Sequence, residues 1–365
     1  MTETYPIIDA DVHIHEATQD LAQFAEGTLK RTLEMDRSAE NWLDTPGYSP
    51  LTNYDAPVAD DPRREVHVVR DRGQLRADLD TLGIDAAIVY TGRLLGTAAR
   101  PDPAYAIGIT RAYNRYLRER WLKPDGGIFG AIMVAPQQPR ESAREIEECA
   151  QDPGFAAVYL PMASVYPLWG HREYDPIFAA AQEAGLPVVL QGYTHVYSIF
   201  PYQLQQFETA LAKQALARPF GATANLVDMA TSGALARYPR LKVVFTECGV
   251  TWLAPVLWRL DQQAQWTRAE IPYDTAKPSE AIMRQVYVTT HRLEAPNNPQ
   301  TLIAIMQDLG LQDKVLFATD WPHYDADRVE RIMGLPLSAD WKRKILSDNA
   351  RAVFRLPQIV TSRTA

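Results

Sequence analysis

The sequence predicts an α/β protein whose 365 residues form a single domain, a (β/α)8 TIM barrel. Eight short apolar segments alternate with longer segments of helical periodicity, as a series of βα units requires. Most apolar segments are near-continuous runs of Val, Ile, Leu and Phe, which is typical of strands buried on both faces of a parallel sheet. A doubly wound open sheet is the alternative, but no glycine-rich nucleotide-binding motif follows the first apolar segment.

Each of the eight apolar segments is interpreted as one barrel strand. In chain order, the predicted strands are Pro6–His15, Ala86–Thr91, Ile128–Ala135, Ala156–Pro161, Val188–Tyr193, Leu241–Glu247, Gln285–His291 and Val315–Asp320.

Several of the intervening segments carry helix signals. Pro139–Ala150 opens with a proline and acidic residues, which favour a helix N-terminus. Tyr174–Gly185 has apolar spacing close to the helical period and ends on a glycine, as many helices do. Trp252–Arg268 and Asn298–Gly310 show similar patterns. These four segments are predicted helices.

Two connections depart from a regular barrel. The segment from Glu16 to about Arg76 is polar, rich in Pro and Asp, and has little periodicity. Because it is too long for an ordinary βα loop, we expect a lid or an interface arm in this insertion, residues 16–76. Between predicted strands five and six, two separate helical segments are expected, at about Tyr202–Ala217 and Ala222–Tyr238.

The composition bounds the classes of function. The formal net charge of -8 argues against nonspecific binding to nucleic acid or to anionic membranes. Cys149 and Cys248 are the two cysteines, far apart in the chain, so a reduced protein without a disulfide framework is expected. No signal peptide and no membrane-spanning run is evident. We therefore expect a soluble, cytoplasmic protein that acts on a small molecule.

Polar side chains gather at the predicted carboxyl ends of the strands, where barrel active sites form. They are His13, His15, Gln191, His195, Glu247, His291 and Asp320. Residues two apart on a strand point to the same face, so His13 and His15 can both face the barrel axis. A lone His-x-His pair is more often a packed or exposed pair. Together with His195 and Asp320, it predicts a site for Zn²⁺ or a similar divalent ion.

At this level of detail the chain resembles a known family. The segments DADVHIH, FATDWPHYDAD and ILSDNARAVFRL, with the histidine after strand five, resemble the amidohydrolase superfamily. The likeness is closest to the amidohydrolase-related branch that includes the aminocarboxymuconate-semialdehyde decarboxylase-like enzymes. The resemblance implies a distorted barrel with one catalytic divalent metal, Zn or Mn, and a homodimer or higher homo-oligomer.

The same resemblance implies roles for individual residues. His13, His15, His195 and Asp320 would be the metal ligands, and Asp320 would also handle a proton. His323, in the Trp-Pro-His turn, would contact Asp320 and hold its side chain in place, and would not contact the substrate.

Two positions differ from the family pattern. In many relatives a histidine directly follows the apolar run of strand five, but here that position holds Gln191 and His195 comes four residues later. His195 is the predicted ligand, with Gln191 or a carboxylate as the alternative. At the end of strand six, Glu247 stands where decarboxylases of this branch commonly have histidine. Glu247 is interpreted as a ligand or general base; the alternative is a salt bridge to an arginine such as Arg259 or Arg292.

Other residues near the strand ends are candidates for binding substrate. They are His291, Arg292, Arg93, Gln191 and Trp321. For three of them there is a simpler explanation: loop or core packing for His291 and Trp321, and an ordinary surface position for Arg93. A Ser-His-Asp triad is not supported, because the chain has no GxSxG motif.

Three functions follow from these patterns. The first is a metal-dependent hydrolase in which Asp320 and Glu247 serve a metal-activated water on a small aromatic or carboxylated substrate. The alternative is a metal-dependent non-oxidative decarboxylase, a carboxy-lyase of an aromatic or dienoic acid. The third is an inactive barrel that binds a partner, which the retained His-x-His pair and Asp320 disfavour.

Overall fold

Eight parallel strands lie side by side in chain order in the computed structural model, which describes residues 5–35, 67–92, 94–163, 165–192, 209–275, 277–323 and 325–361. The strands are β1 (Ile8–Ile14), β2 (Ala86–Thr91), β3 (Ile128–Met133), β4 (Phe155–Pro161), β5 (Val188–Gln191), β6 (Val243–Thr246), β7 (Val286–Thr289) and β8 (Val315–Leu316). All eight predicted strands are present, and each coincides with its predicted segment within a few residues. The predicted barrel is therefore confirmed.

The first strand meets the chain that follows the last one, which brings the two edges of the sheet together. The main-chain N–H of Ala10 donates to the carbonyl of Phe317 (2.8 Å), and that of His13 donates to Trp321 (2.7 Å). In the opposite direction, Asp320 donates to Asp11 (2.9 Å). β8 is shorter than its predicted segment because the chain beyond Leu316 pairs with β1 and not with β7. The carboxyl ends of β1 and β8 are therefore held against each other.

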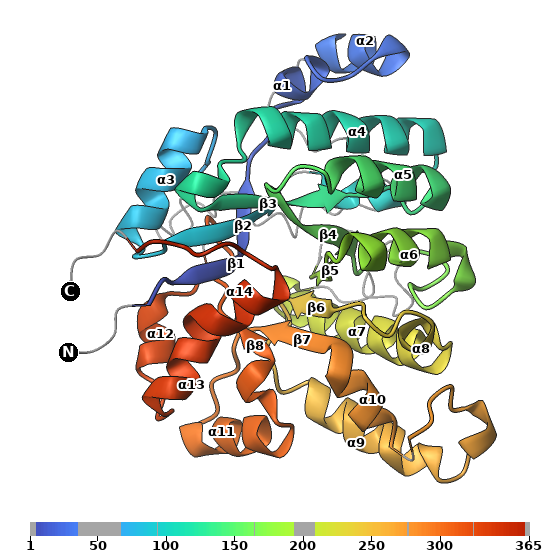
Figure 1. Cartoon of the computed structure of the whole chain (residues 1–365), viewed down its shortest axis with the longest axis vertical. Helices are drawn as coiled ribbons and strands as arrows, with labels where there is room; N and C mark the ends of the chain where they lie inside the picture. The colour runs from blue at the N-terminus through green and yellow to red at the C-terminus, as the bar shows by residue number, and fades with distance from the viewer. Residues whose placement is uncertain are drawn as a thin grey trace.

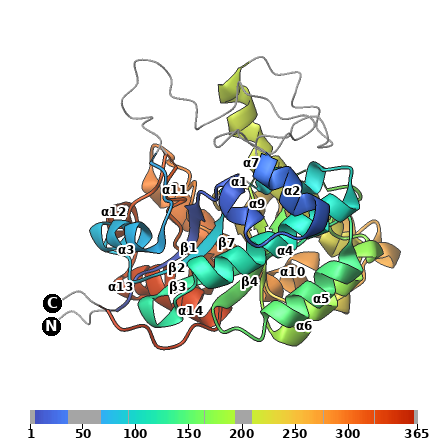
Figure 2. The ribbon, with the colours of Figure 1, turned by 90° about the horizontal axis from the view of Figure 1, so that it is seen from above.

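Helices surround the strands, as Figures 1 and 2 show. They are α1 (Thr18–Ala22), α2 (Gly27–Met35), α3 (Arg72–Thr81), α4 (Pro103–Arg120), α5 (Pro139–Cys149), α6 (Asp175–Ala184), α7 (Ala210–Thr231), α8 (Ala234–Arg237), α9 (Leu253–Ala264), α10 (Pro278–Gln285), α11 (Pro299–Asp308), α12 (Val329–Met333), α13 (Ala339–Arg343) and α14 (Asn349–Val353). The four predicted helices correspond to α5, α6, α9 and α11. Strands and helices bury one large apolar core between them.

Two helical segments were predicted between strands five and six, with a break between Ala217 and Ala222. The predicted break is wrong, because α7 continues through Pro219. A proline inside a helix removes a backbone hydrogen bond and costs about 3 kcal/mol. After the proline, however, Leu226 and Met229 are fully buried. Burial of such a side chain stabilises the fold by about 1.5–3 kcal/mol, so packing outweighs the local penalty. The short α8 follows as a separate helix, and residues 202–208 lie outside the described part of the chain.

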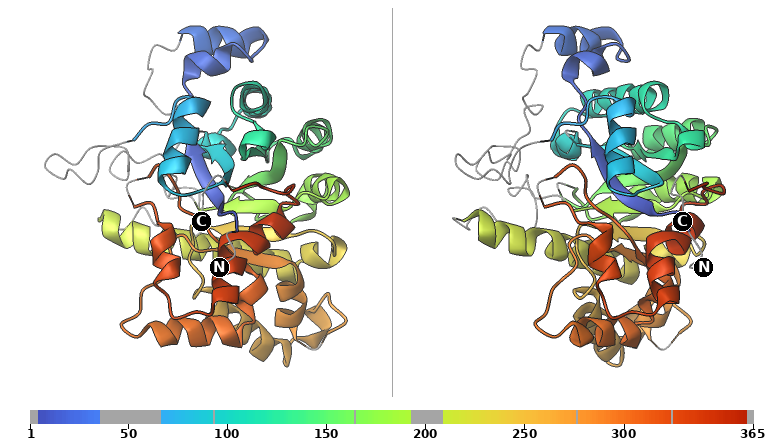
Figure 3. Two further views of the ribbon diagram at one scale, coloured as in Figure 1. Left: turned by 60° about the vertical axis from the view of Figure 1, so that its left-hand side comes forward. Right: turned by 90° about the vertical axis from the view of Figure 1, so that its left-hand side faces the viewer.

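The long insertion contains regular structure at both of its ends, which the sequence did not predict. α1 and α2 pack against α4, and Glu26 pairs with Arg115 of α4 at 2.6 Å. Figure 3 shows these two helices projecting beyond the barrel. Only Leu33 of α2 is buried, so the helix has too narrow an apolar stripe to give a clear period. α3 begins at Arg72, before the predicted end of the insertion at about Arg76. Residues 36–66 lie outside the described residues, and a lid or interface role stays a prediction.

Two expectations from composition can be compared with the structure. Cys149 and Cys248 are both buried and unbridged, as expected for a chain without a disulfide framework. Among the described residues, no helix combines the length and apolar character needed to cross a bilayer.

Candidate metal centre and active site

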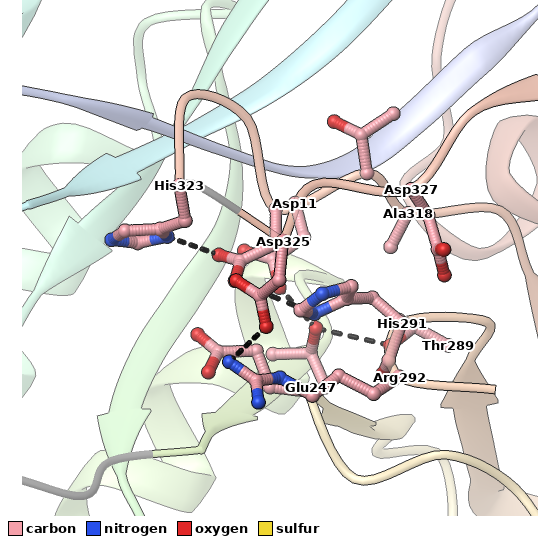
Figure 4. A network of polar contacts seen from close by, with 12 residues as sticks. Asp11, Glu247, Thr289, His291, Arg292, Ala318, His323, Asp325 and Asp327 are labelled. Atoms are coloured by element: carbon pink, nitrogen blue, oxygen red, sulfur yellow. Dashed lines mark hydrogen bonds and ion pairs between the residues drawn. The ribbon is translucent and has the colours of Figure 1, made fainter. Parts of the chain in front are cut away.

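Four buried side chains converge at the carboxyl ends of three strands. Asp11 and His13 come from one face of β1, Glu247 directly follows β6, and Asp320 follows β8. One ligand atom from each lies within 4.8 Å of the others. His13 Nε2 is 3.1 Å from Asp320 Oδ1, 3.3 Å from Asp11 Oδ1 and 3.7 Å from Glu247 Oε1. Figure 4 shows Asp11 and Glu247 in this group together with His291 and His323.

The tautomer of His13 is fixed by the main chain. Its Nδ1 lies 2.8 Å from the carbonyl oxygen of Thr91, and a carbonyl only accepts, so Nδ1 carries a hydrogen. In the neutral ring, Nε2 is then a bare lone pair facing carboxylates. Gln191 Nε2, 3.2 Å away, can donate to this lone pair. Against the carboxylates, the arrangement is favourable if a cation lies between them or the ring is protonated. Burial opposes protonation, but Asp11 and Asp320 outweigh it and raise the pKa of His13 well above its ordinary value.

Two of the carboxylates sit on an unusual backbone. Glu247 and Asp320 have φ of 60° and 63°, in the left-handed region that non-glycine residues rarely adopt. Such positions cost about 1–3 kcal/mol each and concentrate at functional sites. Glu247 directly follows β6, Asp320 lies four residues beyond the end of β8, and both side chains belong to the cluster. This conformation is therefore consistent with a functional role for both residues.

Arg218, on α7, neutralises Glu247. Its Nε donates to Glu247 Oε2 at 2.5 Å, and both side chains are buried. Burial opposes ionisation of Glu247, and Asp320 does too, but Arg218 and His13 hold the pKa of Glu247 below its ordinary value. A salt bridge between Glu247 and an arginine was one predicted alternative, and the structure contains one. Its arginine is Arg218, not one of the two named as examples: Arg259 is exposed and Arg292 pairs with Asp325. Arg218 lay in the predicted break between two helices, where no sequence signal singled it out.

The close approach of Arg218 and Glu247 to strand five depends on Gly192. A Cβ at this position would lie 2.8 Å from the Cβ of Glu247 and 3.0 Å from the Cδ of Arg218. Real Cβ atoms do not approach other atoms so closely. The glycine directly after β5 therefore lets the ends of strands five and six come together at the cluster.

Asp11 is a member of the cluster that the sequence reasoning missed. It accepts hydrogen bonds from Thr246 Oγ1 and from Gln191 Nε2, the latter at 3.2 Å. Burial raises the pKa of Asp11, because the charged form loses its hydration. The signal was available, since Asp9, Asp11 and His13 alternate along β1 and His15 continues the pattern just beyond it. Asp9 faces the same interior and bonds to the side chain and main chain of Thr319.

Asp320 is flanked by three imidazoles. His323 Nδ1 lies 2.7 Å from Asp320 Oδ1, and His291 Nδ1 lies 3.4 Å from Oδ2. Burial opposes ionisation, but His323, His291 and His13 together hold the pKa of Asp320 well below its ordinary value. Neither ring nitrogen of His291 makes a hydrogen bond within the described structure, although the residue is buried. The predicted contact between His323 and Asp320 is thus present.

The remaining predicted residues are spread around the cluster. His15 is buried beside Gly92, beyond the end of β2, and belongs to none of the metal-competent groups formed by the described residues. Trp321 donates from its indole nitrogen to Asp78 at 3.3 Å. His195 and Arg93 lie outside the described residues, so their placement stays a prediction.

The donor set fits a divalent cation. Three carboxylates and one imidazole are the groups that bind Zn²⁺ and Mn²⁺. Asp320 Oδ2 and Gln191 Oε1 are buried and lack a hydrogen-bond partner among the described residues. With Arg218 beside them, Asp11, Glu247 and Asp320 carry a formal excess of two negative charges when ionised. One divalent ion would balance that excess, so charge and chemistry agree.

A parallel barrel with a buried carboxylate and imidazole cluster at its carboxyl end defines a class of metal-binding enzymes. The family model described as amidohydrolase matches residues 10–356, and the chain belongs to this family. The resemblance stated from the sequence is thereby confirmed.

Curated relatives of the chain are decarboxylases. A gamma-resorcylate decarboxylase from Polaromonas sp. is 25% identical over 288 residues, which cover 76% of this chain and 85% of that protein. One from Rhizobium sp. is 24% identical over 298 residues, with the same coverage. These relatives favour the decarboxylase alternative over the hydrolase that the sequence predicted first.

Solved structures share the fold. An amidohydrolase from Mycobacterium avium subsp. paratuberculosis has a TM-score of 0.75 at 22% identity and covers 97% of this chain and 100% of its own. A manganese-bound 5-carboxyvanillate decarboxylase from Novosphingobium aromaticivorans has a TM-score of 0.72 at 22% identity, covering 96% of each chain. At this identity the structures establish the barrel alone.

Proposed function

We propose that this protein is a metal-dependent, non-oxidative decarboxylase of a hydroxylated aromatic acid. The observation that carries the proposal is the buried group of Asp11, His13, Glu247 and Asp320 at the carboxyl end of the barrel. The gamma-resorcylate decarboxylases among the relatives supply the reaction class and the substrate class. The hydrolase has no comparable support from them.

These four residues would hold one divalent ion. When bound, the ion supplies a Lewis acid that binds substrate oxygens and stabilises negative charge. Manganese accompanies two of the structurally similar decarboxylases, from Novosphingobium and Polaromonas, which supports Mn²⁺ among the two candidate ions. His15 and His195 stay predicted ligands, and a homo-oligomer stays a prediction.

The negative charge of Glu247 is an electrostatic objection to a decarboxylase, and its contact with Arg218 supports the proposal against that objection. An acid near a substrate carboxylate is repulsive unless it is neutralised. Arg218 pairs with Glu247 at 2.5 Å in a buried position and cancels that charge. Glu247 can therefore lie close to an anionic substrate without repelling it.

Asp320 and His323 form a proton source beside the cluster. Burial opposes the imidazolium, but Asp320 raises the pKa of His323 above its ordinary value. A proton held by this pair can pass through Asp320 to the ring carbon that bears the carboxylate. The bond to the carboxylate carbon then breaks, its electron pair restores the aromatic ring, and CO2 leaves. His323, partly exposed at 19%, can recover a proton from solvent.

His291 and Arg292 would orient the substrate. Neither ring nitrogen of His291 is occupied by a hydrogen bond from the described chain, and the ring lies against Asp320. A phenol or carboxylate oxygen of the substrate is a suitable partner. Arg292 is partly exposed and paired with Asp325, so it suits a contact with the substrate carboxylate.

The proposal is tested with metal-loaded protein and a panel of hydroxybenzoates that includes 2,6-dihydroxybenzoate. We expect release of CO2 with equimolar formation of the decarboxylated phenol, and one deuterium on the ring when the reaction runs in D2O. Asp320→Asn should lower the rate by at least about 100-fold, the usual contribution of a general acid.

Other outcomes would replace the proposal. Hydrolysis of amides, esters or lactones without CO2 would establish the hydrolase. Absence of stoichiometric divalent metal from carefully purified protein, together with no turnover, would establish the inactive barrel.

A further inference from the structure

Gln191, the last residue of β5, points its amide into the cluster. The residue is fully buried. Its Nε2 lies 2.5 Å from Glu247 Oε1, 3.2 Å from Asp11 Oδ1 and 3.2 Å from His13 Nε2. It also lies 3.4 Å from Asp11 Oδ2. Four acceptor atoms from three of the cluster's side chains therefore converge on this one nitrogen.

This convergence exceeds what an amide can satisfy. An NH2 group carries two hydrogens, so at most two of the four contacts are well-made hydrogen bonds. The other amide atom, Oε1, is buried and makes no hydrogen bond to the described chain. The nitrogen thus occupies a position whose neighbouring atoms would favour a cation. The amide oxygen, by contrast, has no hydrogen-bond partner in the described structure.

We propose that Gln191 is the strand-five ligand of the metal, through Oε1. The inference rests on the metal site of the proposed function. A half-turn about the terminal torsion of the side chain exchanges the oxygen and the nitrogen without moving the rest of the residue. In this structure the nitrogen faces the carboxylates; after the half-turn the oxygen would face the ion. His195, the ligand predicted from the sequence, is the rival for this role.

An amide oxygen changes the character of the site. The ion would meet oxygen atoms from Asp11, Glu247, Asp320 and Gln191, and one nitrogen from His13. Carboxylate and carbonyl oxygens suit Mn²⁺ and Mg²⁺, whereas imidazole favours Zn²⁺. Most protein sites bind Zn²⁺ more tightly than Mn²⁺. Gln191 as a ligand would therefore reduce this difference in affinity.

A second role for Gln191 predicts different results. If the amide only donates hydrogen bonds that hold Asp11 and Glu247 in place, a carboxylate at this position would repel both. If the amide oxygen is a ligand, a carboxylate would bind the ion at least as well. Gln191→Glu therefore separates the two roles, and Gln191→His tests the metal preference.

The experiment measures binding of Mn²⁺ and Zn²⁺ to EDTA-treated full-length protein by calorimetry, with EPR for Mn²⁺. We expect Gln191→Ala to weaken Mn²⁺ binding by more than about tenfold, the lower end of the loss seen when even an outer-shell partner of a metal is removed. Gln191→Glu should retain binding, Gln191→His should raise the Zn²⁺ to Mn²⁺ affinity ratio, and His195→Ala should bind like wild type.

A matched control separates metal binding from folding. Gln285 is also a buried glutamine, but its Nε2 donates to the carbonyls of Tyr238 and Leu241, away from the cluster. Gln285→Ala should leave Mn²⁺ affinity unchanged, and thermal melts of the metal-free variants report any loss of fold.

Three results would overturn the inference. They are unchanged Mn²⁺ affinity in folded Gln191→Ala, equal losses in Gln191→Ala and Gln191→Glu, and loss of metal in His195→Ala but not in Gln191→Ala. Wild-type protein that binds Mn²⁺ yet releases no CO2 would refute the proposed decarboxylase and leave the ligand assignment standing.

Discussion

Three of the four ionisable residues in the cluster each depend on a specific neighbour. Thr91 fixes the tautomer of His13, Arg218 compensates Glu247, and His323 is paired with Asp320. A buried charge without a partner is costly, so these contacts are conditions for keeping the carboxylates ionised in the core. The same contacts leave atoms of Asp320, Gln191 and His291 free to meet a metal or a substrate.

The pair of Arg218 and Glu247 gives a prediction at this scale. Arg218→Met should destabilise the metal-free protein by about 3–5 kcal/mol, because it leaves a buried carboxylate without its counter-charge. The measurement is reversible urea unfolding in EDTA. As a control, Arg240→Met removes an arginine paired with Glu183 across side chains 69% and 86% exposed; its cost should stay below about 1 kcal/mol. Equal effects of the two substitutions would show that Arg218 does not stabilise Glu247.

Strand alternation and strand ends explain how single elements build the site. In β1, Asp9, Asp11 and His13 share one face, and the other face packs Ile8, Ala10 and Val12 into the core. Glu247 and Asp320 follow the ends of β6 and β8 on a left-handed backbone. The elements thus bring the proposed ligands to one level of the barrel, with only a few residues from each.

Helix α4 offers a test of element stability away from the site. Asp102 caps its N-terminus by accepting from the N–H groups of Ala104 and Tyr105, at 2.9 and 3.2 Å. Asp102→Ala should lower the free energy of unfolding by about 1 kcal/mol, whereas Asp102→Asn keeps the cap and should be nearly neutral. Chemical denaturation of both variants checks this; equal losses would mean that the cap contributes nothing measurable.

At the scale of the whole molecule, the proposed metal joins segments that are far apart in the chain. Asp11 and His13 come from the first strand, whereas Glu247 and Asp320 come from the sixth and from the end of the eighth. A ligand that binds only the folded state stabilises it by mass action. The barrel is also closed at this point by main-chain bonds between β1 and residues 317–321.

Metal removal should therefore lower the melting temperature. At a free Mn²⁺ concentration about 100 times the dissociation constant, the metal should add about 2.7 kcal/mol to the free energy of unfolding. Calorimetric melts of EDTA-treated protein with and without added Mn²⁺ measure the effect. Asp320→Asn should respond much less, and an identical melting temperature with and without metal in the wild type would contradict the site.

The barrel and part of the site were within reach of the sequence. Continuous apolar runs mark strands buried on both faces, and the carboxyl ends of such strands meet, so His13, Glu247 and Asp320 could be expected together. The helical insertion was harder to predict, because α2 buries a single leucine. The break expected in α7 failed because local helix preference was outweighed by the packing of Leu226 and Met229.

By itself, the sequence determined the order of the eight strands and of four helices, the positions of His13, Glu247 and Asp320 near strand ends, and the family. Only the tertiary structure decided which charged and polar side chains are in contact. Arg218 reaches Glu247 from 29 residues away, and Gln191 Nε2 reaches Asp11 from 180 residues away. Periodicity and spacing describe neighbours along the chain, whereas the electrostatics of this cluster arise from side chains brought together by closure of the barrel.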